Sequence, residues 1–89
     1  MDPILRLDES TISWRETDDG IVVLNLATSR YLTVNDTGKA LWELLLRGAT
    51  RAQLTARLVE TFDIDGDVAR IDVGDFLDQL AATGVLLAP

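Results

Sequence analysis

The 89-residue chain contains no cysteine and no histidine. Without them the usual ligands of zinc and copper, thiol nucleophiles, disulfides and imidazole bases are all missing. Most enzyme mechanisms are thereby excluded, and the sequence indicates neither a metal site nor a cofactor. Carboxylates, hydroxyls and apolar side chains remain, and these suit a binding protein better than an enzyme.

Basic residues are also scarce, because 8 lysines and arginines stand against 15 aspartates and glutamates, for a formal net charge of −7. Nucleic-acid binding requires a surface that neutralises phosphates, and anionic membranes attract basic segments in the same way. The charge balance therefore argues against both partners. The acidic excess has two possible explanations: it keeps the protein soluble, or it forms an acidic surface that steers a basic partner.

Long hydrophobic runs are absent as well. No stretch approaches the roughly 20 apolar residues of a membrane-spanning helix, and residues 1–9 lack the basic start and apolar run of a signal peptide. We therefore expect a cytoplasmic protein. The length is that of one domain, expected to span residues 1–89, and the apolar fraction of 47% is typical of a globular fold.

Three segments in the first third of the chain predict an antiparallel sheet, with strands at 11–16, 21–26 and 31–34. In the first segment, alternation puts Ile12 and Trp14 on one face, which we expect to be buried. Asp19 and Gly20 favour a hairpin turn, because both tolerate positive φ angles. The nearly continuous apolar run of the second strand is typical of a central strand covered on most of both faces. The third strand is then at the sheet edge.

Helical spacing follows and predicts three helices, at 37–47, 50–63 and 65–84. Asn35 or Asp36 caps the first helix, and Thr50 with Gln53 forms a capping box for the second. We expect an α+β fold that resembles a winged helix-turn-helix, with a three-stranded antiparallel N-terminal sheet followed by three helices. The inward helix faces should form a core beneath the sheet from Leu41, Leu45, Leu58, Val73, Leu77 and Leu80.

The third helix carries two apolar residues on its polar side. Val68 and Ile71 lie among Asp72, Asp75 and Gln79, opposite the core stripe. Isolated apolar residues are ordinary on protein surfaces, and the N-terminal strands are a second possible cover for them. The alternative is that the pair lines a groove for a ligand.

Two motifs suggest functions that their neighbouring residues contradict. The acidic run 63–67 resembles the start of a calcium loop, but Val68 and Gly74 stand where that loop needs glycine and a bidentate glutamate. The last two helices resemble a DNA-binding helix-turn-helix, yet the aspartates of the third helix outnumber its single arginine, so phosphate would repel it. We interpret both features as architecture and solvated surface.

The junction of the third strand and the first helix reads YLTVNDTGKALWELL over residues 31–45. This junction resembles the PqqD-like family, in which a strand ends in an apolar residue and Asn, followed by Thr-Gly or Thr-Ala and a helix of Leu-Trp-x-Leu-Leu type. The run from Asp72 to Leu86 is similar to the closing helix of that family. Together the two segments extend the resemblance over most of residues 10–87.

The resemblance implies a recognition element for ribosomally synthesised and post-translationally modified peptides (RiPPs). Such elements are not catalysts; they bind the leader segment of a precursor and present its core to modifying enzymes. A free-standing copy of this length resembles the recognition protein of lasso peptide systems. That protein works beside a leader peptidase and an ATP-dependent cyclase, whereas the original family member serves a radical enzyme in quinone cofactor biosynthesis.

An edge strand exposes unpaired backbone groups that accept an extended peptide as a further strand. The resemblance implies the same binding mode. If the third helix lies along that edge, its polar side meets the peptide, and its acidic residues bind polar or basic side chains. The predicted peptide-binding residues are Arg30, Tyr31, Leu32, Thr33, Val34, Val68, Ile71, Asp72, Asp75 and Gln79.

Two other classes of function remain open. One is an acidic winged-helix module that pairs with another protein in regulation and does not bind DNA. The other is a small enzyme subunit with carboxylate chemistry, although no segment places two carboxylates beside an apolar pocket and a nucleophile. A coding sequence next to genes for a short precursor, a protease and a cyclase would favour leader binding over both.

Overall fold

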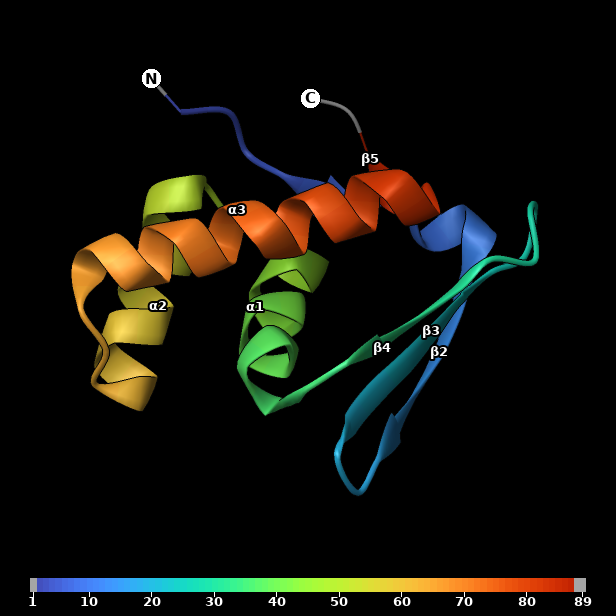
Figure 1. The fold of residues 1–89 in the computed structure, drawn as a ribbon. Helices are drawn as coiled ribbons and strands as arrows, with labels where there is room; N and C mark the ends of the chain where they lie inside the picture. The colour runs from blue at the N-terminus through green and yellow to red at the C-terminus, as the bar shows by residue number, and fades with distance from the viewer. Residues whose placement is uncertain (1, 88–89) are drawn as a thin grey trace.

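The computed structural model describes residues 2–87 (Figure 1). Its elements in chain order are β1 (Arg6–Leu7), the 3₁₀ turn η1 (Glu9–Thr11), β2 (Ile12–Thr17), β3 (Gly20–Asn25), β4 (Tyr31–Val34), α1 (Asp36–Arg47), α2 (Arg51–Phe62), α3 (Gly66–Thr83) and β5 (Leu86–Leu87). The predicted α+β class is confirmed, because a three-stranded antiparallel sheet of order β2-β3-β4 precedes three helices. Figure 1 shows the long helix α3 passing across α1 and α2, with the sheet projecting from the helices.

Two connections fix the sheet. Gly20, which follows the β2–β3 turn, has a φ of 150° and lies so close to β4 that any Cβ there would collide with the Val34 carbonyl group. After β3, the buried Asn25 accepts a hydrogen bond from the Ala27 N–H at 2.9 Å through its side-chain oxygen. Its side-chain nitrogen donates to the Thr83 carbonyl, also at 2.9 Å. Asn25 therefore ties the β3–β4 hairpin to the C-terminal end of α3.

The first two helices begin at the predicted caps, and the third begins at the predicted position. The Asn35 side chain accepts a hydrogen bond from the Gly38 N–H at 2.9 Å, which identifies the cap of α1. Thr50 and Gln53 form the complete capping box of α2. The Asp65 side chain caps α3 by accepting from the Asp67 N–H at 2.8 Å. Local sequence thus determines where each helix starts.

The two ends of the described chain form a second sheet that the sequence pattern does not indicate. Strand β1 pairs antiparallel with β5, and Leu5 forms a bridge to Ala49 in the α1–α2 link. Leu5, Leu7 and Val85 are buried. A strand of two residues is too short to show period-two alternation, so hydropathy alone cannot reveal it.

The predicted core is confirmed. All six core residues named above are at most 2% exposed. The fully buried Trp42 joins them from α1, and Ile21 and Val23 join them from the sheet. The three helices therefore share one core with the inner face of β3.

Two expectations for the sheet are wrong. Strand β2 has no buried face, since Ile12 is half-buried and Trp14 is 38% exposed, although the Trp14 ring centroid lies 5.8 Å from that of Trp42. Strand β3 is covered on one face only, with Val23 buried and Leu24 exposed. The cause is the projecting position of the sheet, which leaves its outer face and its β2 side uncovered (Figure 1).

Candidate functional site

Strand β4 has one paired edge and one open edge. It pairs with β3, and among residues 2–87 no strand pairs with its other side. Hydrogen-bonded and non-hydrogen-bonded pairs alternate along an antiparallel ladder. The Asn25 N–H donates to the Arg30 carbonyl at 2.7 Å, which sets this alternation. The N–H and C=O groups of Tyr31 and Thr33 therefore point away from β3, toward the open edge.

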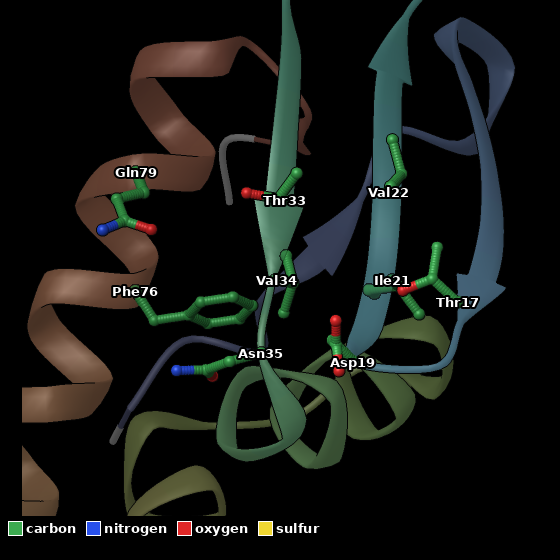
Figure 2. Close-up of a pocket in the computed structure, with 9 residues that line it drawn as sticks. All are labelled: Thr17, Asp19, Ile21, Val22, Thr33, Val34, Asn35, Phe76 and Gln79. Carbon is green, nitrogen blue, oxygen red and sulfur yellow. The ribbon is translucent and has the colours of Figure 1, made fainter.

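Helix α3 lies along this open edge (Figure 2). Near the start of β4, the Arg30 Nη1 atom donates to the Ala82 carbonyl at 3.1 Å. Near the end of β4, Phe76 and Val34 line the same hollow, so β4 and α3 run antiparallel. Figure 2 shows the Phe76 side chain directed from α3 toward β4, with Gln79 about one turn further along the same helix. The open backbone edge thus faces the side chains of a helix.

Two hollows lie between β4, α3 and the start of α1. The larger, of about 560 Å³, extends over the end of the sheet, and the smaller, of about 260 Å³, lies between α1 and α3. Asn35, Phe76 and Gln79 line both, so the hollows form one continuous groove, the β4–α3 groove. Its lining is Thr17, Asp19, Ile21, Val22, Thr33, Val34, Asn35, Thr37, Gly38, Leu41, Asp72, Asp75, Phe76 and Gln79.

Phe76 forms the floor of the groove where the two hollows meet. It is 8% exposed and packs where the first turn of α1 approaches β4 and α3. A Cβ atom on Gly38 would lie 2.5 Å from the Val34 Cγ1 atom and 3.0 Å from the Phe76 Cε1 atom. The absence of a side chain at Gly38 therefore allows β4, α1 and α3 to meet beneath the groove.

The groove is acidic. Asp19 lines it from the β2–β3 turn, and Asp72 and Asp75 line it from α3. No lysine or arginine is among its lining residues. Asn35 and Gln79 add neutral hydrogen-bonding groups. Such a groove favours a ligand with basic and polar side chains, and its attraction should weaken as salt is added.

The structure brings part of the predicted site together. Thr33 and Val34 line the β4–α3 groove from the strand, and Asp72, Asp75 and Gln79 line it from the helix. Thr33 and Val34 line its larger hollow, Asp72 and Asp75 line its smaller one, and Gln79 lines both, so residues from two segments separated by the whole of α1 and α2 border one continuous groove.

The other predicted residues of β4, and Arg30 directly before it, do not line the groove. Arg30 is held by its hydrogen bond to α3, and the Tyr31 side chain is 71% exposed. Leu32 is half-buried and packs against the core. These residues contribute backbone or positioning rather than groove-facing side chains.

The structure does not place Val68 and Ile71 in the groove. They are 49% and 63% exposed and lie one helical turn before Asp72 and Asp75 on α3. The pair therefore extends the same side of the helix beyond the smaller hollow, where neither the strands nor the core covers it.

Phe76, Asn35 and Gly38 are groove residues that the sequence analysis does not identify. Phe76 falls on the core stripe and Asn35 has the pattern of a cap, and both residues also perform these local roles. Gly38 is the one signal in the sequence that could have indicated this packing. Glycine is unfavourable in a helix, so its presence in the first turn suggests that another element approaches the backbone closely there.

Neither metal ligands nor a membrane span emerge from residues 2–87. No three acidic side chains in this part of the chain gather closely enough to hold a metal ion. Each helix found there is too short or too polar to cross a bilayer.

The fold and the groove define a small α+β domain of winged-helix type with an open sheet edge beside its longest helix. The chain belongs to the family described as "Coenzyme PQQ synthesis protein D (PqqD)", which matches residues 20–86. This range contains β3, β4 and all three helices, and so nearly all of the groove. A comparison with curated proteins finds no match.

Solved structures share the fold. One, described as "Lasso peptide synthetase B1 complexed with the leader peptide", is 27% identical with a TM-score of 0.81, over 94% of this chain and 98% of that one. "TbiB1 in Complex with the TbiA(beta) Leader Peptide" is 24% identical with a TM-score of 0.83, over 94% and 96%. The PqqD part of Methylobacterium extorquens PqqCD, described as a stand-alone RiPP recognition element, is 25% identical with a TM-score of 0.74, over 96% and 89%.

Proposed function

We propose that this protein binds the leader segment of a ribosomally synthesised precursor peptide as an added strand in the β4–α3 groove. The observation that carries this proposal is the open edge of β4, where Tyr31 and Thr33 direct their backbone groups toward α3. An extended peptide satisfies such groups. The similarity to a lasso peptide synthetase B1 solved with a leader peptide supports the same function.

The dimensions of the edge indicate what the backbone contributes. Four residues of β4 offer about 13 Å of strand, which matches about four residues of peptide. Tyr31 and Thr33 together provide two donors and two acceptors. At about 0.5–1.5 kcal/mol net per hydrogen bond, these four groups contribute about 2–6 kcal/mol to binding. Backbone hydrogen bonds give little sequence selectivity, because nearly every peptide sequence can form them. Selectivity must then come from side chains that meet Phe76 and the acidic walls.

Binding without catalysis is the role that this arrangement fits. The groove presents backbone edge, an aromatic floor and exposed carboxylates, all of which bind and orient a peptide. The bound leader then delivers its precursor to a leader peptidase and, in a lasso system, to a cyclase. We expect this to take place in the cytoplasm, where the precursor is synthesised.

The outer face of the sheet is suited to meet such an enzyme. Leu24 and Tyr31 stand directly opposite each other on β3 and β4 and are 36% and 71% exposed. Leu26, just beyond β3, is 59% exposed. Because this apolar surface adjoins the open edge, an enzyme that docks on it would contact the bound leader as well.

The test is titration of the protein with a fluorescently labelled leader peptide, taken from a precursor gene identified near its own coding sequence. Thr33→Pro removes an edge donor and leaves the ladder to β3 intact, because the Thr33 N–H points away from β3. It should weaken binding about ten-fold or more. Thr33→Val keeps the donor and should bind like the wild type. Equal loss in the two variants would count against strand addition, and no leader binding by the wild type would remove the function altogether.

A further inference from the structure

A third hollow lies at the other end of α1, between its last turn and helix α2. It measures about 270 Å³ and shares no lining residue with the β4–α3 groove. We call it the α1–α2 hollow. Its apolar part comes from Leu44, Ala49 and Ala56, and its charged rim from Arg47, Arg57 and Glu60.

An exposed apolar side chain lies next to one of the lining residues of this hollow. Gly48 lines the hollow, and a Cβ atom on it would lie 3.1 Å from the Ile4 Cγ2 atom. Ile4 therefore packs over Gly48, although it remains 55% exposed. An exposed apolar residue beside an apolar hollow is typical of a docking surface.

Basic residues gather at this end of a protein that is otherwise acidic. Arg47 and Arg57 line the hollow, Arg51 begins α2, and the Arg6 Nη1 atom donates to the Arg47 carbonyl at 3.3 Å. Within residues 2–87 none of these arginines forms an ion pair with a carboxylate. Their charges are thus available to a partner, whereas the β4–α3 groove has no basic residue in its lining.

We propose that the α1–α2 hollow docks an acidic segment of a partner protein. An apolar side chain of the segment sits against Leu44 and Ala56, and its carboxylates pair with Arg47 and Arg57. Charge complementarity selects this class of partner, because arginines outnumber the one glutamate in the rim of this hollow and the aspartates of the groove favour the opposite charge. The 12 residues of α1 separate its two ends by about 16 Å, so both surfaces can be occupied at once.

The test is an NMR titration of the ¹⁵N-labelled full chain with a synthetic amphipathic helix that carries leucines on one face and glutamates elsewhere. A peptide with lysine in place of glutamate is the control. Chemical shifts should change around Ala49 and Ala56, and only with the glutamate peptide. No change, equal change with both peptides, or change confined to β4 and α3 would overturn the proposal.

Two variants separate docking from net charge. Ala56→Glu and Ala52→Glu make the same replacement at exposed positions of α2, but only Ala56 lines the hollow. Ala56→Glu should weaken binding of the glutamate peptide about ten-fold or more, and Ala52→Glu about two-fold or less. Equal weakening would contradict a specific site. Leader affinity should be unchanged in both variants. A failure of the docking proposal can therefore be distinguished from a failure of the leader-binding proposal.

Sedimentation velocity at high protein concentration tests whether a second copy of the chain, and not a partner protein, occupies the α1–α2 hollow. A monomer in both the wild type and Ala56→Glu agrees with a partner protein. Self-association that disappears in Ala56→Glu would identify the second copy as the occupant and overturn the proposal.

Discussion

Adding one methyl group at Gly38 should destabilise the protein, although glycine-to-alanine changes inside helices usually do the reverse. The backbone of Gly38 has no positive φ, so alanine suits its conformation and should gain about 0.5–1 kcal/mol from helix propensity. The new Cβ, however, would lie 2.5 Å from the Val34 Cγ1 atom. Overpacking of this kind costs about 1–3 kcal/mol. We therefore expect a net loss of about 1–2 kcal/mol in the free energy of unfolding.

Gly74→Ala is the matched control. Gly74 also lies in a helix without a positive φ, but a Cβ there would meet no atom within 4 Å. It should stabilise the protein by about 0.5–1 kcal/mol, so the two alanine variants should differ by about 1.5–3 kcal/mol. Urea unfolding of both variants measures this difference directly. If Gly38→Ala proves as stable as Gly74→Ala, the close packing of α1 against β4 and α3 is wrong.

Gly38→Ala also tests whether the leader contacts the floor of the groove. Relief of the clash requires Val34 or Phe76 to move, and both line the β4–α3 groove. Leader affinity of Gly38→Ala should therefore fall at a temperature where the variant is still folded, whereas Gly74→Ala should bind like the wild type. Unchanged affinity in a destabilised Gly38→Ala protein would mean that the leader does not contact this floor.

Three further predictions concern the core, the exposed apolar pair and the acidic wall. Leu45→Ala, at a fully buried position, should cost about 2–5 kcal/mol in thermal or urea unfolding, and an unchanged melting temperature would contradict the core assignment. Ile71→Gln should change stability by no more than about 0.5 kcal/mol, yet weaken leader binding by about 1–3 kcal/mol in a titration if the leader continues along α3; wild-type affinity would exclude that part of the helix. Asp72→Asn should slow association with a basic leader and reduce its salt dependence in stopped-flow mixing, whereas Asp78→Asn, outside the groove lining, should have a smaller effect.

The sequence predicts the helices well because their signals are local. Asn35, Thr50 and Asp65 form hydrogen bonds within three residues of themselves, so the caps are visible without any knowledge of the fold. The inward positions follow from helical periodicity, and Leu45 and Leu80 are buried as expected.

The sheet is predicted less well because burial depends on where other elements pack. Trp14 has the spacing of a covered residue, but it lies on the outermost strand and only its contact with Trp42 covers it in part. Leu24 has the composition of a covered residue, but it lies on the outer face of the sheet, opposite the buried Val23. The pairing of β1 with β5 joins segments from opposite ends of the chain, and two residues per strand carry too little pattern to reveal it.

The groove is predicted in part for the same reason. An edge strand follows from the order of the strands, and the resemblance to a known family supplies the peptide. The meeting of Gly38 with Phe76 depends on the angle at which α1 crosses α3, which no local pattern specifies. Val68 and Ile71 lie on the same side of α3 as Asp72 and Asp75, as predicted. They are one helical turn too far from β4 to line the groove.

An open sheet edge must accept a peptide strand and still avoid pairing with the edge of another copy. Helix α3 favours the first over the second. The Arg30 hydrogen bond to Ala82 holds the helix beside β4, so the open edge borders a groove and is not a flat, accessible edge. A second copy would have to bring its own α3 and its own aspartates into that space, against steric overlap and like charge. A single extended segment carries no such bulk. If the leader binds in the β4–α3 groove as proposed, the helix that contacts it should also disfavour edge-to-edge pairing of two copies, and the ligand should be a segment that is extended and unpaired before it binds.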